Sequence, residues 1–148
     1  MKQHENSPTN DDLKKLSHIY QVKFAIFCAR QVIHLVDEKY LSTCEKTIEV
    51  VEKWLIGEAS DEECSATANA AYATANAAAY AAAYAAYAAA HAAYAAAYAA
   101  ITANAAAYAA NAAAHANDKQ KLINEQWEVY NDLLNINVCL ENAIGLSS

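Results

Sequence analysis

Histidine and carboxylate side chains are the first candidates for acid–base chemistry in this sequence. His34 precedes Asp37 and Glu38 by three and four residues, so a helix would place the imidazole beside both carboxylates. A carboxylate can orient an imidazole for general-base catalysis, but surface charge pairs use the same spacing, and we favour the surface pair. The sequence also lacks the glycine-rich phosphate loop, the HExxH zinc motif and the GxSxG nucleophile motif. We therefore predict a protein that is not an enzyme.

Thiol chemistry is the second possibility. The four cysteines, Cys28, Cys44, Cys64 and Cys139, form no CxxC pair and lie too far apart in sequence to suggest a zinc site. We expect reduced cysteines that are buried as small apolar residues, and we predict no metal and no cofactor. The first residues, MKQHENSPTNDD, have no apolar core of the kind found in secretion signals. A cytoplasmic protein is the resulting expectation.

A regular row of larger side chains could do recognition chemistry instead. It runs through an alanine-rich segment, residues 64–117, that contains no charged residue, and it covers 46 residues in 13 steps. A step near 3.5 residues is typical of one face of a helix, and alanine is the best helix former. The row consists of Asn69, Tyr72, Asn76, Tyr80, Tyr84, Tyr87, His91, Tyr94, Tyr98, Ile101, Asn104, Tyr108, Asn111 and His115.

Two interpretations of this row stay open. Tyrosines can fill the gaps between helices while their hydroxyl groups reach the surface. Tyrosine is also common in binding interfaces, because it offers rigid contact area at a small entropic cost. Under the second interpretation, the candidate partner- or ligand-binding residues are Tyr80, Tyr84, Tyr87, His91, Tyr94, Tyr98 and Arg30.

The charge of the chain narrows the choice of partners. Formal net charge is −7 and the isoelectric point is about 5.1, so no cationic surface is available for nucleic acid. An acidic protein suits a basic protein partner, although solubility alone would also explain the charge. Arg30 is the only arginine and is the strongest candidate for contact with an anion. Asparagine and histidine recur along the uncharged segment and would be costly in lipid, so we predict no membrane span.

The elements that must position these residues are predicted to be helices, because glycine and proline are scarce. The first helix is expected from residue 11 to about residue 40. A second should open at a capping box, residues 42–45, and end at Gly57, with Ile48, Val51 and Trp54 facing inward. Another capping box, residues 60–63, precedes the alanine-rich segment. The last helix should follow Asp118. Its apolar stripe consists of Leu122, Gln126, Val129, Leu133, Ile136 and Leu140.

Packing of the alanine-rich segment decides the architecture. A methyl-covered surface without charge must be covered by other helices or by another subunit. One unbroken helix over residues 65–117 would be about 80 Å long, so we favour a hairpin broken between about residues 98 and 105. The alternative is one long helix buried in an oligomer. We predict an all-α antiparallel bundle of four or five helices, with an alanine-rich central helix or helical hairpin. A flexible tail, residues 1–10, should precede one self-associating domain, residues 11–144.

Three parts of the sequence resemble a known family. They are CARQV at residues 28–32, KTIEVVEKWLIGE at residues 46–58 with the alanine-rich segment that follows, and NEQWE at residues 124–128. Together they are similar to the alanine-rich putative immunity proteins of bacterial polymorphic toxin systems, which phages and prophages also carry. The resemblance covers roughly residues 24–134. In that family arginine, aspartate or glycine often interrupts the alanines, whereas tyrosine and asparagine do so here.

This resemblance implies an all-helical cytoplasmic protein that neutralises a cognate toxin or effector by binding it, and it supplies no catalytic residues. The alternative function is sequestration of a nucleotide-like signal in a pocket between helices or subunits. Tyrosine faces can stack on bases, and Arg30 could then meet a phosphate group. The expected partner is thus a protein or a small molecule, with no nucleic acid and no membrane, and the protein is expected to be a homo-oligomer.

Overall fold

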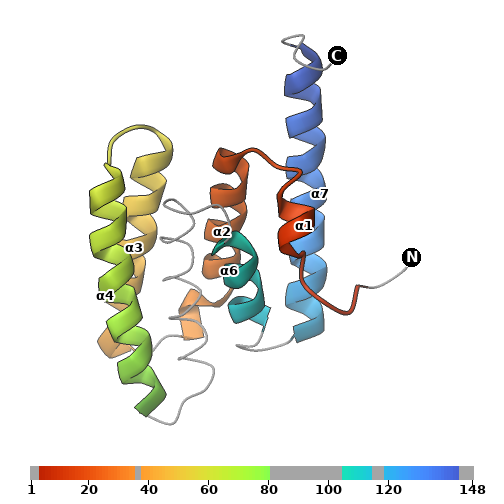
Figure 1. Ribbon diagram of the computed structural model, residues 1–148. Coiled ribbons are helices and arrows are strands. Elements are labelled where there is room, and N and C mark those ends of the chain that lie inside the picture. The colour runs from red at the N-terminus through yellow and green to blue at the C-terminus, as the bar shows by residue number, and fades with distance from the viewer. Residues whose placement is uncertain (1–3, 36–37, 81–104, 115–118, 144–148) are drawn as a thin grey trace.

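The computed structural model describes residues 4–35, 38–80, 105–114 and 119–143, and every regular element within those ranges is a helix (Figure 1). The elements are α1 (Asn10–Leu13), α2 (His18–Val32), the 3₁₀ helix η1 (Ile33–Leu35), α3 (Glu38–Leu55), α4 (Asp61–Tyr80), α6 (Ala105–Ala114) and α7 (Lys119–Ala143). The prediction of an all-α helical bundle is confirmed.

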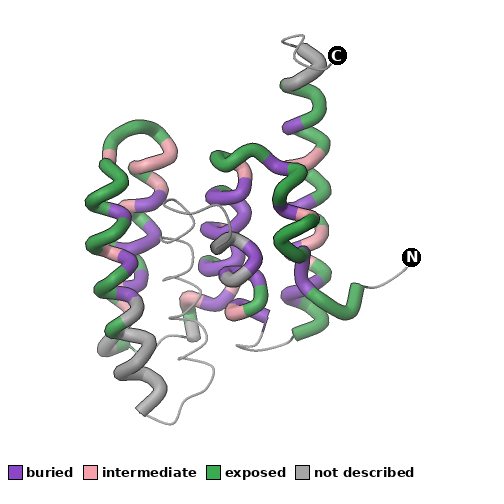
Figure 2. The backbone as a smooth tube through the Cα atoms, in the orientation of Figure 1, coloured by how far each residue is buried: buried purple, intermediate pink, exposed green. Residues whose placement is uncertain are grey.

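Helix α2 is the centre of the bundle. It packs against α3 on one side and against α6 and α7 on the other, while α4 packs against α3. Figure 1 shows that α2, α3 and α4 alternate in direction and that α7 runs antiparallel to α2. Figure 2 shows buried residues along α2 and along α6. Within the range predicted for the first helix, most of the buried residues therefore belong to α2.

The predicted extent of the first helix is wrong. Helix α1 ends at Leu13 and α2 begins at His18, because Ser17 caps α2 by accepting a hydrogen bond from the Tyr20 amide. The Ser17 amide itself donates to Asn137 Oδ1 of α7 at 3.1 Å. Capping chemistry and a contact with a distant helix therefore interrupt an apolar pattern that continues through the break.

The predicted start of the second helix is also wrong. Helix α3 begins at Glu38 and runs to Leu55, so residues 42–45 lie inside it and do not cap it. A capping sequence acts only where the residues before it leave the helix. Its inward residues are nonetheless as predicted, since Ile48 and Val51 are fully buried and Trp54 packs against the core.

The predicted turn between the second and third long helices is confirmed. Gly57 has a φ of 78°, its amide donates to Trp54 O at 3.1 Å, and the Glu58 amide donates to Lys53 O at 2.8 Å. This bond pair is the usual glycine-terminated helix end. The Glu63 amide then donates to Ser60 Oγ at 3.1 Å, and the Ser60 amide donates to a Glu63 carboxylate oxygen at 3.1 Å. The two caps close the α3–α4 hairpin.

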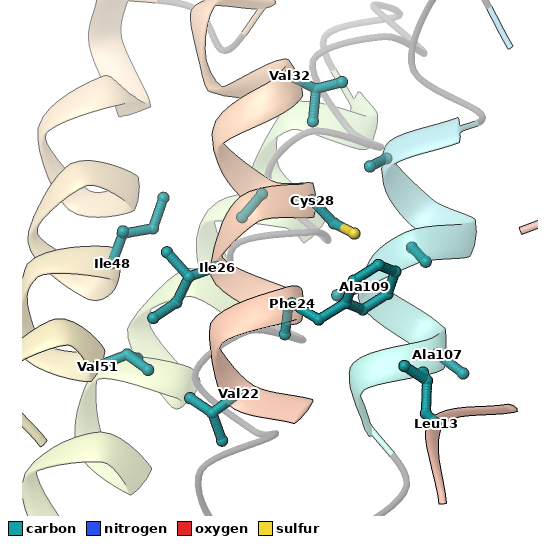
Figure 3. Packing of buried hydrophobic residues seen from close by; sticks show 14 of the residues in the cluster. Leu13, Val22, Phe24, Ile26, Cys28, Val32, Ile48, Val51, Ala107 and Ala109 are labelled. Atoms are coloured by element: carbon teal, nitrogen blue, oxygen red, sulfur yellow. The ribbon is translucent and has the colours of Figure 1, made fainter. Parts of the chain in front are cut away.

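Alanine provides the contact between α2 and α6. Ala109, Ala110 and Ala113 are fully buried. In Figure 3, Phe24 and Cys28 point from α2 toward α6, and Ala109 lies beside the Phe24 ring. The expectation that alanine faces are covered by other helices is confirmed for α6.

The choice between one unbroken alanine-rich helix and a hairpin depends on residues 81–104, which lie outside the described residues. Helix α4 packs against α3, whereas α6 packs against α1, α2 and α7, so the two ends of the segment return to the same bundle. The predicted break between residues 98 and 105 lies outside the described residues, except that α6 begins at Ala105.

The apolar stripe predicted for the last helix is buried only in its first half. Leu122 and Gln126 of α7 are buried, but Ile136 and Leu140 are each 48% exposed. Figure 1 shows this end of α7 extending past the start of α2, which explains the exposure. Polar Asn137 is buried instead, because it accepts the bond from Ser17.

Residues 4–9 contact α7. The His4 ring stacks on Trp127 with centroids 3.9 Å apart, and Trp127 Nε1 donates to the Asn6 carbonyl at 2.8 Å. Ser7 is buried beside them. The division into a flexible tail over residues 1–10 and one domain over residues 11–144 stays a prediction.

Candidate partner-binding groove

A groove of about 510 Å³ lies between α2 and α7. Helix α2 contributes Phe27, Arg30 and Gln31, and α7 contributes Glu125, Glu128, Val129 and Asp132. Half-buried Phe27 and Val129 form the apolar part of the lining. The groove therefore combines apolar surface with charged side chains from two antiparallel helices.

Three carboxylates share one face of α7. Glu125, Glu128 and Asp132 are spaced three and four residues apart, which is the spacing of neighbours on a helix surface. Glu125 is half-buried, and the other two are exposed. With Arg30 as the single cation in the lining, the groove carries three formal negative charges against one positive charge. A field of this sign favours cationic groups and opposes phosphate.

Half-buried Gln31 and fully buried Gln126 fix the inner wall of the groove. Gln31 Nε2 donates to Leu122 O and to Glu125 Oε1, both at 3.1 Å. Gln126 Nε2 donates to Gln31 Oε1 at 3.1 Å and to Ala110 O at 3.0 Å. The Glu125 carboxylate is thereby oriented by contacts that join α2, α6 and α7. Gln31 and Gln126 occupy apolar positions in the sequence pattern, and this mismatch was the available signal for the network.

Arg30 has a partner on the side away from α7. Its Nη2 donates to Glu52 Oε1 of α3 at 2.5 Å, and both side chains are about half exposed, at 48% and 44%. The candidate anion-binding residue of the sequence is therefore held by a carboxylate of the same chain. The structure brings Arg30 together with Glu125, Glu128 and Asp132, none of which the sequence analysis proposed as site residues.

The side chains of the other predicted site residues lie outside the described part of the structure. Tyr80 is the last residue of α4, and its side chain is outside the described part. Tyr84, Tyr87, His91, Tyr94 and Tyr98 lie outside the described residues. Two other members of the row, Asn69 and Asn111, are exposed. Those two positions agree with a row that faces solvent.

The predicted acid–base cluster is only partly described. His34 lies in η1 and Glu38 at the start of α3, both exposed, and Asp37 lies outside the described residues. In the described ranges, no three side chains of histidine, cysteine, aspartate or glutamate are placed to hold a metal ion together. None of the helices described is both long enough and apolar enough to cross a bilayer.

Three of the four thiols are buried as expected, and one is not. Burial raises the pKa of Cys28 well above its usual value, and it raises the pKa of Cys44 and of Cys64 to about 11. Nearby carboxylates add to the rise at these two thiols, Glu45 at Cys44 and chiefly Asp61 at Cys64. Cys139 of α7 is exposed, so the expectation of four buried cysteines is wrong there.

Thiol labelling should separate these cysteines. The thiolate is the reactive form, and a raised pKa keeps a thiol protonated at pH 8. We expect a disulfide reagent such as Ellman's reagent to modify Cys139 rapidly in the folded protein at pH 8. Cys28, Cys44 and Cys64 should react only in denaturant. Rapid release of more than one equivalent of chromophore from the folded protein would contradict this burial, and Cys139→Ser provides the control that should release none.

The comparisons with known proteins identify a family. No curated protein and no solved structure matches the chain. The Imm-5 like putative immunity protein family matches over residues 11–134, a range that contains every residue lining the groove. The resemblance to an immunity protein family is confirmed, and this chain belongs to the Imm-5 like putative immunity protein family.

Proposed function

We propose that the protein neutralises a toxin or effector by binding it directly and without catalysis. Membership of the immunity protein family over residues 11–134 is the observation that carries this proposal. A protein with this function would act as a stoichiometric inhibitor, so it would need a complementary surface and not a catalytic centre.

Charge supports a basic partner. The chain carries a formal net charge of −7, and the groove between α2 and α7 is lined by three carboxylates and one arginine. Opposite charges on two partners speed their encounter and exclude partners of the wrong sign. The alternative, a nucleotide-like ligand, finds no support in this groove, because its carboxylates would repel phosphate.

The tyrosine row is a second candidate surface for the same partner. The exposed positions of Asn69 and Asn111 favour a row that faces solvent, and tyrosine suits a protein interface. Self-association and a cytoplasmic location stay predictions. The mass of the pure protein in solution, measured by light scattering, tests the first of them.

Protection of cells from a toxin tests the proposed function. A toxin domain encoded by a gene beside this one is the first domain to express, under an inducible promoter, with and without this protein. We expect the protein to restore growth and to form a stoichiometric complex with the purified domain. A single-charge control such as Glu45→Gln, which lies on exposed α3 surface, should protect equally. If neither that domain nor a panel of basic toxin domains is bound or neutralised, the proposal is wrong.

A further inference from the structure

We propose that the groove between α2 and α7 is the toxin-docking site and that it accepts a lysine- or arginine-bearing segment of the toxin. We further propose that Glu52 is a positioning residue, which holds Arg30 away from the groove carboxylates. Both statements rest on the proposed immunity function. They name the surface it uses and the chemistry of the partner.

The carboxylates of α7 that line the groove are available to a partner. Glu128 and Asp132 are exposed, and neither makes an ion pair or a side-chain hydrogen bond within the described part of the chain. Glu125 to Asp132 covers about 10 Å of helix axis at 1.5 Å per residue. Two or three cationic side chains on one helical face or one extended segment of a partner could meet these carboxylates together.

The apolar lining fits the same type of side chain. Phe27 and Val129 line the groove beside the carboxylates. Lysine and arginine bury long aliphatic stems on apolar surface while the charged end stays near carboxylates or water. A groove of about 510 Å³ has room for such side chains. An anionic ligand would instead be repelled by the three carboxylates of the lining.

The contact between Arg30 and Glu52 decides the charge that a partner meets. Arg30 lines the groove, but its guanidinium donates to Glu52 Oε1 across the α2–α3 contact. The arginine side chain is flexible, and removing Glu52 as a partner would leave the groove carboxylates as the nearest alternative anions in the lining. Arg30 would then compete with the cationic groups of the toxin. Arg30 is therefore expected to oppose docking of a basic segment, and Glu52 to assist it.

Charge-neutralising variants of matched shape test the docking site. The groove variant combines Glu125→Gln, Glu128→Gln and Asp132→Asn, which keeps an oxygen acceptor for the bond from Gln31. The control variant combines Glu45→Gln, Glu49→Gln and Glu58→Gln, three exposed residues of α3 and the α3–α4 turn. Both variants change the net charge equally. Circular dichroism and urea unfolding must show that both fold like the unmodified protein.

Two probes are used with these variants. One is the purified toxin domain from the protection experiment. The other is an acetylated peptide whose arginines are spaced three and four residues apart, as the groove carboxylates are, with a glutamine peptide of the same length as its control. Nuclear magnetic resonance of the labelled protein should show shifts for α2 and α7 amides around the groove. The affinity for either probe should fall at least about tenfold in the groove variant and less than about threefold in the control variant.

Affinities of single and double variants test the positioning role of Glu52. Glu52→Gln should lower affinity about threefold, and Arg30→Gln should raise it by about the same factor. In the Arg30→Gln background, Glu52→Gln should have no further effect, because the competing cation is gone. Reduced affinity in Arg30→Gln would overturn this role and make Arg30 an anion-binding residue.

The outcomes separate this inference from the function on which it rests. Equal losses in the groove and control variants, or full protection by the groove variant, would overturn the docking site while leaving toxin neutralisation intact. Groove-specific binding of the arginine peptide by a protein that neutralises no toxin would overturn the proposed function and support the recognition chemistry.

Discussion

Replacing Gln126 with alanine should lower the free energy of unfolding by about 4 kcal/mol. Gln126 is fully buried in α7 and bonds to three other parts of the fold. Its side-chain Oε1 accepts a hydrogen bond from Ser7 Oγ at 2.6 Å. Its side-chain Nε2 donates to Ala110 O and to Gln31 Oε1. The alanine variant would leave these buried groups without their partner and would also leave a cavity.

Graded variants separate the contribution of the hydrogen bonds from the contribution of the cavity. Gln126→Met keeps most of the volume but removes the hydrogen bonds, so a loss of about 2–3 kcal/mol is expected. Ser7→Ala removes one hydrogen-bond donor only and should cost about 1 kcal/mol. Urea unfolding followed by circular dichroism measures all three. If Gln126→Met were as stable as the unmodified protein, the hydrogen bonds would contribute nothing net, and the buried network would not explain how α2, α6 and α7 are held together.

Local chemistry explains what the sequence predicted well. The Gly57 turn and the Ser60 cap depend on residues within a few positions of each other, so their pattern is complete in the sequence. The residues of α3 that face inward follow from helical spacing for the same reason. Helix boundaries set by distant contacts were predicted wrongly. Ser17 begins α2 as its N-cap, partly because Asn137, far along the chain, accepts a hydrogen bond from its amide.

The groove was beyond prediction from the sequence for a related reason. Its walls come from residues about a hundred positions apart, and they meet only because α7 runs antiparallel to α2. Glu125, Glu128 and Asp132 look like the solvent-facing side of any amphipathic helix. The pairing of Arg30 with Glu52 likewise depends on how α2 packs against α3. The only signal in the sequence for this part of the molecule is that polar Gln31 and Gln126 stand at apolar positions of the helical pattern.

The sequence does not show which alanines are buried, whereas the structure does. Every methyl group in the alanine-rich segment is chemically the same, yet Ala109 is fully buried and Ala66 is exposed. Helical spacing separates the row of large residues from the alanines. It does not say which alanine face meets another helix.

Replacing Ala109 with leucine should therefore destabilise the fold by about 3 kcal/mol. Ala109 faces the Phe24 ring across the α2–α6 contact (Figure 3), and a larger side chain there must displace one helix or force strained rotamers. Ala66→Leu, at an exposed position of α4, should change stability by less than about 0.5 kcal/mol. Leucine and alanine differ little in helix propensity, so packing is the main difference between the two variants. Thermal and urea unfolding measure both.

A compensating substitution distinguishes overpacking from general damage to α6. Phe24→Ala alone should cost about 4 kcal/mol by leaving a cavity. Combined with Ala109→Leu, it should cost at least about 1 kcal/mol less than the sum of the two single changes, because the added leucine fills part of the space that the ring leaves. Strict additivity would mean that the two side chains do not share a contact. Equal effects of leucine at positions 66 and 109 would mean that α6 is not packed against α2 by its alanine face, and the arrangement that also places α7 beside α2 would then be wrong.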